Sequence, residues 1–204
     1  MQKVNRSKFL KELQSINKPY FTINDLGKVL NLPEKSLRVT CTRLVKSGDI
    51  YRLRKNIYAL DNSPQNIQKI ANLIYWPSYL SFESALALYG IINQIPYTSI
   101  FATKLKTKKI TLADQSIEYH QIAPNLFFGY TLQKDLFIAL PEKALLDQLY
   151  LVSFGKAKLD FDELNLKELS KTKFLKFSKK FPLRTQKLAK KLSTQFGTIS
   201  ITIK

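Results

Sequence analysis

The stretch FTINDLGKVLNLPEKSLRVTCTRLVKSGDIYRLRKNIYAL, residues 21–60, decides the fold of this chain. Its apolar residues first recur at the three- and four-residue spacing of a helix, and then alternate with polar residues at the two-residue period of a strand. Thr22 followed three positions later by Asp25 indicates a helix start, and Gly48 indicates a helix end. The stretch therefore predicts two helices and a β-hairpin, over residues 22–31, 33–48 and 49–60.

The second of these helices has two chemically different faces. Leu37, Cys41, Leu44 and Val45 form its apolar stripe at about 100° per residue. Glu34 lies in the first turn, where a carboxylate offsets the helix dipole instead of meeting a ligand. The opposite face and its flanks therefore offer hydrogen-bond donors and no acid, and they consist of Lys35, Ser36, Arg38, Val39, Thr42, Arg43 and Lys46.

The predicted hairpin has a basic tip. Arg52, Arg54 and Lys55 surround the turn, and Asn56 suits the turn itself because asparagine tolerates positive φ. With a further helix expected over residues 7–14, the three helices and the hairpin form a winged helix-turn-helix.

Beyond a linker at Ser63-Pro64, helical periodicity alternates with short β-type runs. Ser81 is expected to cap one helix and Pro141 to open another. The runs suggest a small, mostly antiparallel sheet bracketed by helices. The helices are predicted over 67–75, over 82–90 and from 141 onwards, and the runs are SIFAT (99–103), KKITL (108–112), SIEYHQI (116–122), LFFGY (126–130) and LFIAL (136–140).

We therefore expect an α+β protein with a winged helix-turn-helix at 1–62 and an α/β regulatory domain at 63–204, of which 155–204 is a basic helical extension. Within this extension LNLKELSK (164–171), KFLKFSKKF (173–181) and PLRTQKLAKKL (182–192) are predicted as amphipathic helices, and GTISITIK (197–204) alternates like an edge strand.

Positive charge gathers at both ends of the chain. The net charge is +18. Residues 1–60 contain 13 basic and 4 acidic residues, residues 61–154 contain 7 of each, and residues 155–204 again contain 13 basic and 4 acidic residues. Like charges repel within a compact fold, so this surplus indicates a polyanionic partner, nucleic acid first and an acidic membrane surface second. The lysine-rich composition of AT-rich genomes is a simpler alternative.

The residues give no pattern of an enzyme. A single cysteine and His120 make no metal-ligand cluster, and the six glycines form no phosphate-binding loop. Cys41 is expected in the core and His120 half-buried in a strand. Glu142 is interpreted as a charge in the first turn of its helix, and Asp147 as a polar side chain on the surface. We therefore expect no catalytic residues, metal or cofactor, and a cytoplasmic protein, since neither a signal peptide nor a run of roughly 20 apolar residues is present.

A winged helix-turn-helix of this kind would bind double-stranded DNA. Its third helix would enter the major groove, where Arg38 or Arg43 could pair with guanine O6 and N7. Ser36, Thr42 and the lysines would reach bases or phosphates. The wing residues would hold the phosphate backbone or enter the minor groove.

The sequence resembles the AbiEi antitoxins, the antitoxins of AbiE-type abortive-infection systems, over roughly residues 5–150. Residues 21–60 are similar to the family's winged helix, and four later blocks match it in motif and order. These blocks are YLSFESALALYGI, IFATKLKTKKI, EYHQIAPNLFFGY and IALPEKALLDQLYL.

This resemblance implies a type IV antitoxin that is not an enzyme, represses its own operon at inverted repeats and counteracts a nucleotidyltransferase-type toxin. An inverted-repeat operator would take two copies of the chain. The resemblance also associates antitoxin action with the second domain, which we carry over to Ser81–Gly90 and Pro141–Tyr150 as a hypothesis. Three alternatives remain: a stand-alone winged-helix regulator with an effector-binding second domain, a nucleic-acid-modifying enzyme or nuclease subunit, and a peripheral membrane protein.

Overall fold

The computed structural model describes residues 5–196, so the strand predicted over 197–204 lies outside it. The chain forms two compact units. The first consists of Met1–Ala71 with Thr111–Gln115, and the second of Asn72–Ile110 with Ser116–Lys204. The expectation that residues 1–62 and 63–204 are separate domains stays a prediction.

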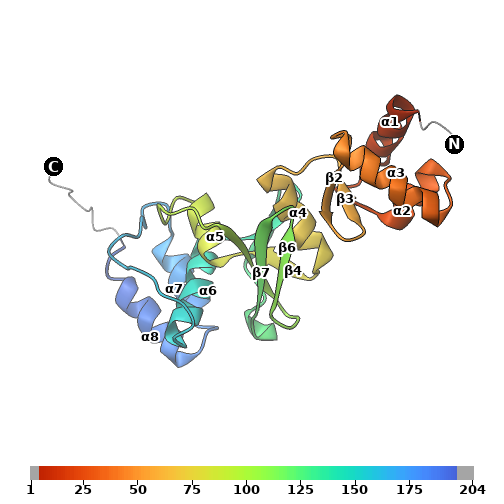
Figure 1. The fold of residues 1–204 in the computed structure, drawn as a ribbon. Helices are drawn as coiled ribbons and strands as arrows, with labels where there is room; N and C mark the ends of the chain where they lie inside the picture. The colour runs from red at the N-terminus through yellow and green to blue at the C-terminus, as the bar shows by residue number, and fades with distance from the viewer. Residues whose placement is uncertain (1–4, 197–204) are drawn as a thin grey trace. The chain divides into compact units, whose positions relative to one another are not determined.

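The first unit is a winged helix-turn-helix, as the sequence predicted (Figure 1). Three helices stand beside a small antiparallel sheet in the order β1-β3-β2. The helices are α1 (Arg6–Ile16), α2 (Ile23–Leu30) and α3 (Glu34–Lys46), and the strands are β1 (Phe21–Thr22), β2 (Tyr51–Arg54) and β3 (Ile57–Ala59), followed by α4 (Pro64–Ile74).

Local chemistry sets the ends of these helices. Thr22 and Asp25 form the predicted capping box, in which Asp25 N donates to Thr22 Oγ1 and Thr22 N donates to Asp25 Oδ2. Asn31 ends α2 in the left-handed region, and Gly48 follows α3 with a φ of 74°. The two ends of α2 and the end of α3 therefore follow from residues at or next to each end.

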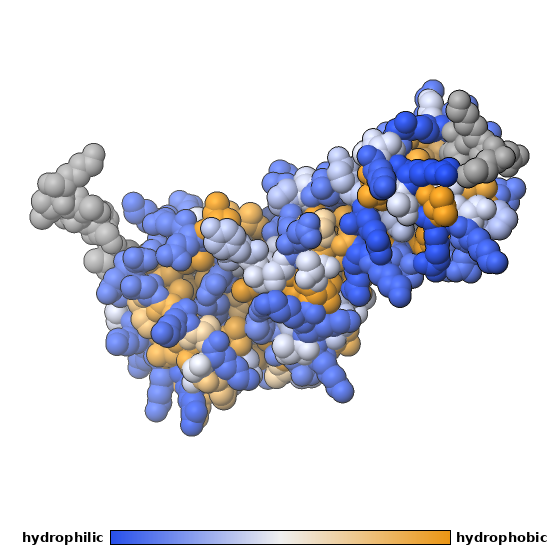
Figure 2. Space-filling model, viewed as in Figure 1, coloured by the Kyte–Doolittle hydropathy of each residue, from blue (hydrophilic) through white to orange (hydrophobic). Residues whose placement is uncertain are grey.

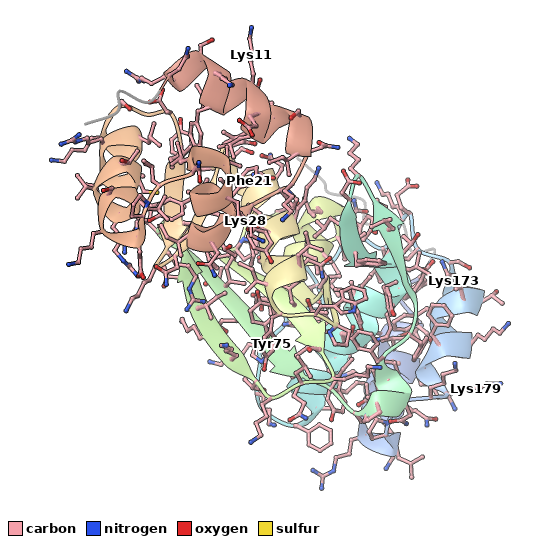
Figure 3. The ribbon with its side chains drawn as sticks, turned by 90° about the vertical axis from the view of Figure 1, so that its right-hand side faces the viewer. Lys11, Phe21, Lys28, Tyr75, Lys173 and Lys179 are labelled. Atoms are coloured by element: carbon pink, nitrogen blue, oxygen red, sulfur yellow. The ribbon has the colours of Figure 1, made fainter. Side chains whose placement is uncertain are left out.

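The apolar stripe of α3 lies in the core of the first unit. Leu37, Cys41 and Leu44 are buried there together with Leu13 of α1 and Phe21 of β1. Figure 3 shows Phe21 inside the unit and Lys11 extending away from α1. Cys41 is fully buried and is therefore a core residue, as predicted, and this burial raises the pKa of its thiol.

The second unit is built on a six-stranded sheet in the order β6-β7-β5-β4-β9-β8. The sheet contains antiparallel pairs, as expected, in β4 with β5 and β8 with β9. It is mixed, because β4 with β9 and β5 with β7 are parallel pairs. The strands are β4 (Ser78–Leu80), β5 (Thr98–Thr103), β6 (Lys108–Leu112), β7 (Gln115–Gln121), β8 (Tyr130–Gln133) and β9 (Leu136–Ala139), and the helices are α5 (Phe82–Leu88), α6 (Pro141–Ser153), α7 (Lys171–Ser178), α8 (Leu183–Leu192) and the 3₁₀ turn η1 (Pro124–Leu126).

Two predicted elements of the second unit are wrong. LFFGY is a strand only from Tyr130, because η1 precedes it and Gly129 is left-handed with a φ of 69°. Residues 164–170 form no helix; there the backbone N–H of Asn165 donates to the Ile91 carbonyl of another loop. The strand β4 was not predicted; its three residues are all buried and therefore show no alternation.

The interpretation of Asp147 as a polar surface residue is wrong, because its side chain is fully buried. Glu142 does lie in the first turn of α6, as interpreted, but it is buried as well. Helix α6 contacts α5, α7 and α8, and its residues 142–149 are all buried. Glu142 accepts from the Ser170 backbone N–H at the start of α7 and pairs with Lys173 at 3.0 Å. These carboxylates therefore hold α6 in place from inside the unit.

Asp147 and Lys143, one turn apart on α6, form a fully buried ion pair. Asp147 also accepts hydrogen bonds from the hydroxyls of Tyr79 and Ser81, at 3.0 and 2.8 Å. Ser81 does occupy the N-cap position of α5, but its hydroxyl donates to Asp147 and accepts no hydrogen bond from the helix backbone. Burial raises the pKa of Asp147, which Lys143 opposes, and burial lowers the pKa of Lys143.

The Lys143 side chain has further partners besides Asp147. Its ammonium donates to Tyr79 Oη at 2.9 Å and lies over the rings of Phe128 and Phe181. A Cβ at Gly129 would lie 3.2 Å from Lys143 Cγ, so the backbone approaches the lysine as closely as only glycine allows. The buried ammonium therefore has all its partners within the second unit.

We predict that Asp147→Asn lowers the free energy of unfolding by about 3–5 kcal/mol, because it leaves the Lys143 ammonium buried without its counter-charge. The double variant Lys143→Met with Asp147→Leu removes both charges, and we expect it to lose far less than the sum of the two single variants. Urea unfolding followed by circular dichroism measures both. Additive losses would show that the two charges do not depend on each other.

Candidate nucleic-acid interface

Helix α3 presents a continuous polar face at the surface of the first unit. The side opposite its buried stripe is exposed over its whole length. Besides Glu34 in the first turn, the exposed residues of the helix are Lys35, Ser36, Arg38, Val39, Thr42, Arg43 and Lys46. On the visible face of this unit, hydrophilic side chains predominate over apolar ones (Figure 2). The structure therefore brings all seven predicted helix residues together on one accessible element.

The two arginines of this face have different surroundings. Arg38 Nη2 pairs with Glu34 Oε1 at 3.0 Å, one turn away on the exposed side of α3. Arg43 has no ion pair or side-chain hydrogen bond within the described residues. An exposed pair of this kind contributes about 0.3–0.5 kcal/mol, so Arg38 can leave Glu34 for a phosphate or base at little cost. Arg43 needs no such exchange.

Thr42 differs from its predicted role as a donor. Its hydroxyl donates to the Arg38 carbonyl at 2.9 Å, back along the helix. Because the hydroxyl proton of Thr42 is used in this bond, its oxygen can only accept a hydrogen bond from a ligand. Val39, 49% exposed, adds an apolar contact of the kind that meets a thymine methyl group.

The wing carries the remaining three predicted residues. Arg52 and Arg54 lie on β2 and Lys55 in the turn, and all three side chains are exposed. Asn56 closes the turn with a φ of 64°, as predicted. The pairing of β2 with β3 shifts between Arg52 and Arg54, and such a bulge turns the strand locally.

Backbone hydrogen bonds fix the wing to the rest of the first unit. Ile23 N at the start of α2 donates to the Asn56 carbonyl at 3.0 Å. On the other side, Ala113 N donates to the Leu53 carbonyl of β2 at 2.8 Å, from the Thr111–Gln115 segment that belongs to this unit. These backbone hydrogen bonds add to the apolar core, in which Ile50 and Tyr58 pack with the side chains of the helices.

Sequence reasoning missed a basic residue on α2. Lys28 is exposed and has no ion pair in the described part of the chain, and Figure 3 places it on this helix. The first helix of a helix-turn-helix crosses the DNA backbone, so Lys28 is suited to a phosphate. The sequence could have predicted this exposure, because Leu26 and Val29 mark the apolar side of α2 and Lys28 lies away from it.

Residues 5–196 contain no group of three or more His, Cys, Asp or Glu side chains able to hold a metal. His120 is half-buried beside Glu118 and against Phe82, and burial lowers its pKa while Glu118 raises it. A search of the same residues for a helix that could cross a membrane finds none.

The segment that carries this interface matches a known family. Residues 8–60 match the family described as "Transcriptional regulator, AbiEi antitoxin". The match runs from α1 to the last strand of the first unit and includes all ten predicted contact residues. The resemblance drawn from the sequence is thereby confirmed for this part of the chain.

A solved structure has a similar fold over most of the chain. The crystal structure of RV2827C protein from Mycobacterium tuberculosis superposes with a TM-score of 0.67 and 16% sequence identity, covering 94% of this chain and 76% of that one. At this identity the likeness concerns the fold alone. No protein of curated function matches the chain.

We predict that the first unit loses stability in acid through Asp49. Hydrogen bonds from Arg6 and Ser47 lower the pKa of Asp49 in the folded chain. Asp49 therefore contributes stability above its unfolded pKa of about 3.9, and this contribution disappears as the pH falls through its lower folded value.

Thermal unfolding from pH 6 to pH 2 measures this effect. The Asp49→Asn variant should unfold at a lower temperature than the parent protein at pH 6, and at nearly the same temperature at pH 2. Glu12→Gln, which alters an exposed carboxylate of α1, serves as the control and should follow the parent throughout. An equal loss for Asp49→Asn at every pH would contradict the prediction.

Proposed function

We propose that this chain, whose residues 8–60 belong to the AbiEi family of antitoxin transcriptional regulators, binds operator DNA and represses its own operon. The observation that carries the proposal is the acid-poor face of α3 next to an exposed basic wing. Its contact residues are Lys35, Ser36, Arg38, Val39, Thr42, Arg43, Lys46, Arg52, Arg54 and Lys55.

In this proposal α3 lies in the major groove of double-stranded DNA. Arg43 takes the base-reading role ahead of Arg38, because Arg38 is paired with Glu34 and Arg43 has no such partner among the described residues. Arg52, Arg54 and Lys55 hold phosphates or enter the minor groove, and fix register without reading sequence. An inverted-repeat operator would take two copies of the chain. Because the proposed protein acts on DNA, we also propose that it is cytoplasmic.

The proposed second role is antitoxin action against a nucleotidyltransferase-type toxin, with no catalysis by this chain. Helix α6 is buried over residues 142–149, so Pro141–Tyr150 would serve this role as a frame and not as a contact surface. Ser81–Gly90, by contrast, exposes Leu88 at 59%. Co-expression with a toxin from a neighbouring gene, scored by growth, tests this role; a toxin whose effect is unchanged would remove it.

A stand-alone regulator with an effector-binding second unit remains the alternative. A cavity of about 840 Å³ in that unit favours it. A neighbouring gene with nucleotidyltransferase motifs would favour the antitoxin, and the absence of such a gene would favour the alternative.

We predict that Arg43→Ala weakens binding to the upstream region of the chain's own gene by about 10- to 100-fold, as expected when a bidentate pairing with one guanine is removed. Binding to random duplex of equal length should fall much less. A gel shift titrated with salt measures both. Lys11→Ala removes one charge from an exposed site on α1 and should change neither. Equal losses on the two duplexes would remove Arg43 from the base-reading role.

We predict a different pattern for the wing. Arg54→Ala with Lys55→Ala should weaken binding to both duplexes by the same factor and reduce the slope of log K against log salt by about 0.9 for each phosphate that is no longer neutralised. An unchanged slope would show that the wing binds no phosphate. Loss of binding to the upstream region alone would assign it base recognition instead.

A further inference from the structure

The second unit contains an open groove that the proposed DNA binding does not use. Its volume is about 840 Å³, and its walls come from residues 92–97, residues 158–163 and the end of α8, with Glu83 of α5. We call it the α5–α8 groove. All of these segments belong to one compact unit.

Hydrogen bonds hold the two loops of the groove together. Asn165 donates from its backbone N–H to the Ile91 carbonyl at 2.9 Å, and from Nδ2 to the Gly90 carbonyl at 3.2 Å. Gln148, buried on α6, donates to Glu83 Oε1 at 3.0 Å and to the Lys158 carbonyl at 3.4 Å. The groove is therefore formed before any partner binds, which lowers the entropic cost of binding.

The groove has an apolar floor and two apolar side chains at its lip. Its half-buried lining includes Ile92, Phe161 and Leu188. At the lip Ile95 is 86% exposed and Tyr97 is fully exposed. Figure 2 shows apolar side chains among hydrophilic ones on this helical part of the unit. Large apolar side chains that project beside a preformed groove are typical of a surface that a partner covers.

The charge of the groove is opposite to that of the chain. Four carboxylates line it, Glu83, Asp160, Asp162 and Glu163, against the two ammonium groups of Lys158 and Lys191. None of the four carboxylates is in an ion pair within residues 5–196. The chain as a whole carries a net charge of +18 with only 15 acids, so this concentration of carboxylates is local. It attracts cations and repels phosphate.

We propose that the α5–α8 groove docks a basic segment of a partner protein, in which an aliphatic or aromatic side chain is flanked by Lys or Arg. The apolar anchor packs on the floor between Ile95 and Tyr97, and the flanking cations pair with Asp160, Asp162 and Glu163. Nucleic acid does not fit this site, because the carboxylates repel its phosphates. A small polyamine would use the carboxylates and leave the two lip residues exposed. The inference is independent of the proposed DNA binding.

The net charge of the chain makes a selective experiment possible. A protein of charge +18 retains acidic peptides nonspecifically and repels basic ones, so enrichment of basic peptides has to come from a local site. The probe is a random twelve-residue peptide library displayed on phage. It is first depleted on the full-length double variant Ile95→Ser with Tyr97→Ser, and then selected on the unaltered full-length chain.

The expected result is a set of peptides with Lys or Arg on both sides of Leu, Ile, Phe or Tyr. Selection of acidic peptides, or no enrichment, would overturn the proposal. Because both altered side chains are exposed, the variant should keep its fold, which circular dichroism verifies before depletion.

The strongest selected peptide, labelled with fluorescein, then tests the charges by fluorescence polarisation. Replacing the three loop carboxylates, as Asp160→Asn, Asp162→Asn and Glu163→Gln together, should weaken binding at least about tenfold and flatten its salt dependence. Two control variants should leave binding unchanged. Glu168→Gln removes an exposed acid outside the groove, and Leu132→Ser removes an exposed apolar side chain on β8. Equal weakening by the controls, or displacement of the peptide by spermidine at equimolar concentration, would overturn the proposal.

Discussion

The Lys143–Asp147 pair is the constraint on which the second unit depends. Both groups are fully buried on α6, and Asp147 joins that helix to β4 and to the start of α5 through Tyr79 and Ser81. A buried charge pair is costly to form and more costly to break, so it favours a single register of helix against sheet. The α5–α8 groove rests on this frame, because Gln148 of the same helix holds both Glu83 and the loop that follows α6.

The first unit is organised differently, by backbone hydrogen bonds around an apolar core. The capping box at Thr22 fixes the start of α2, and the Ile23-to-Asn56 bond ties that start to the wing. Gly27 lets α2 approach α3 closely, since a Cβ there would lie 3.0 Å from Leu37 Cδ2. These constraints hold the donor face of α3 and the basic wing in one rigid arrangement, which a surface that matches the shape of DNA needs.

Opposite charges lie on different surfaces of the chain. In the first unit the exposed face of α3 has Glu34 as its only acid, and that acid is neutralised by Arg38. In the second, α7 and α8 contain no acid at all, whereas the loop at 158–163 gathers three carboxylates. Lys173 and Lys179, labelled in Figure 3, lie on the α7 side of this unit. Such separation allows one chain to attract a polyanion and a basic protein segment at different surfaces.

The sequence by itself determined the winged helix-turn-helix, its helix ends and the ten candidate contacts, because each signal there is local. The stripe of Leu37, Cys41 and Leu44 defines the exposed side of α3 before any tertiary contact is known. Only the tertiary structure decided the environment of Glu142 and Asp147, the mixed sheet and the α5–α8 groove. A helix covered on every side has no polar face, and its carboxylates look like surface residues until their partners, more than sixty positions away for Asp147, are known.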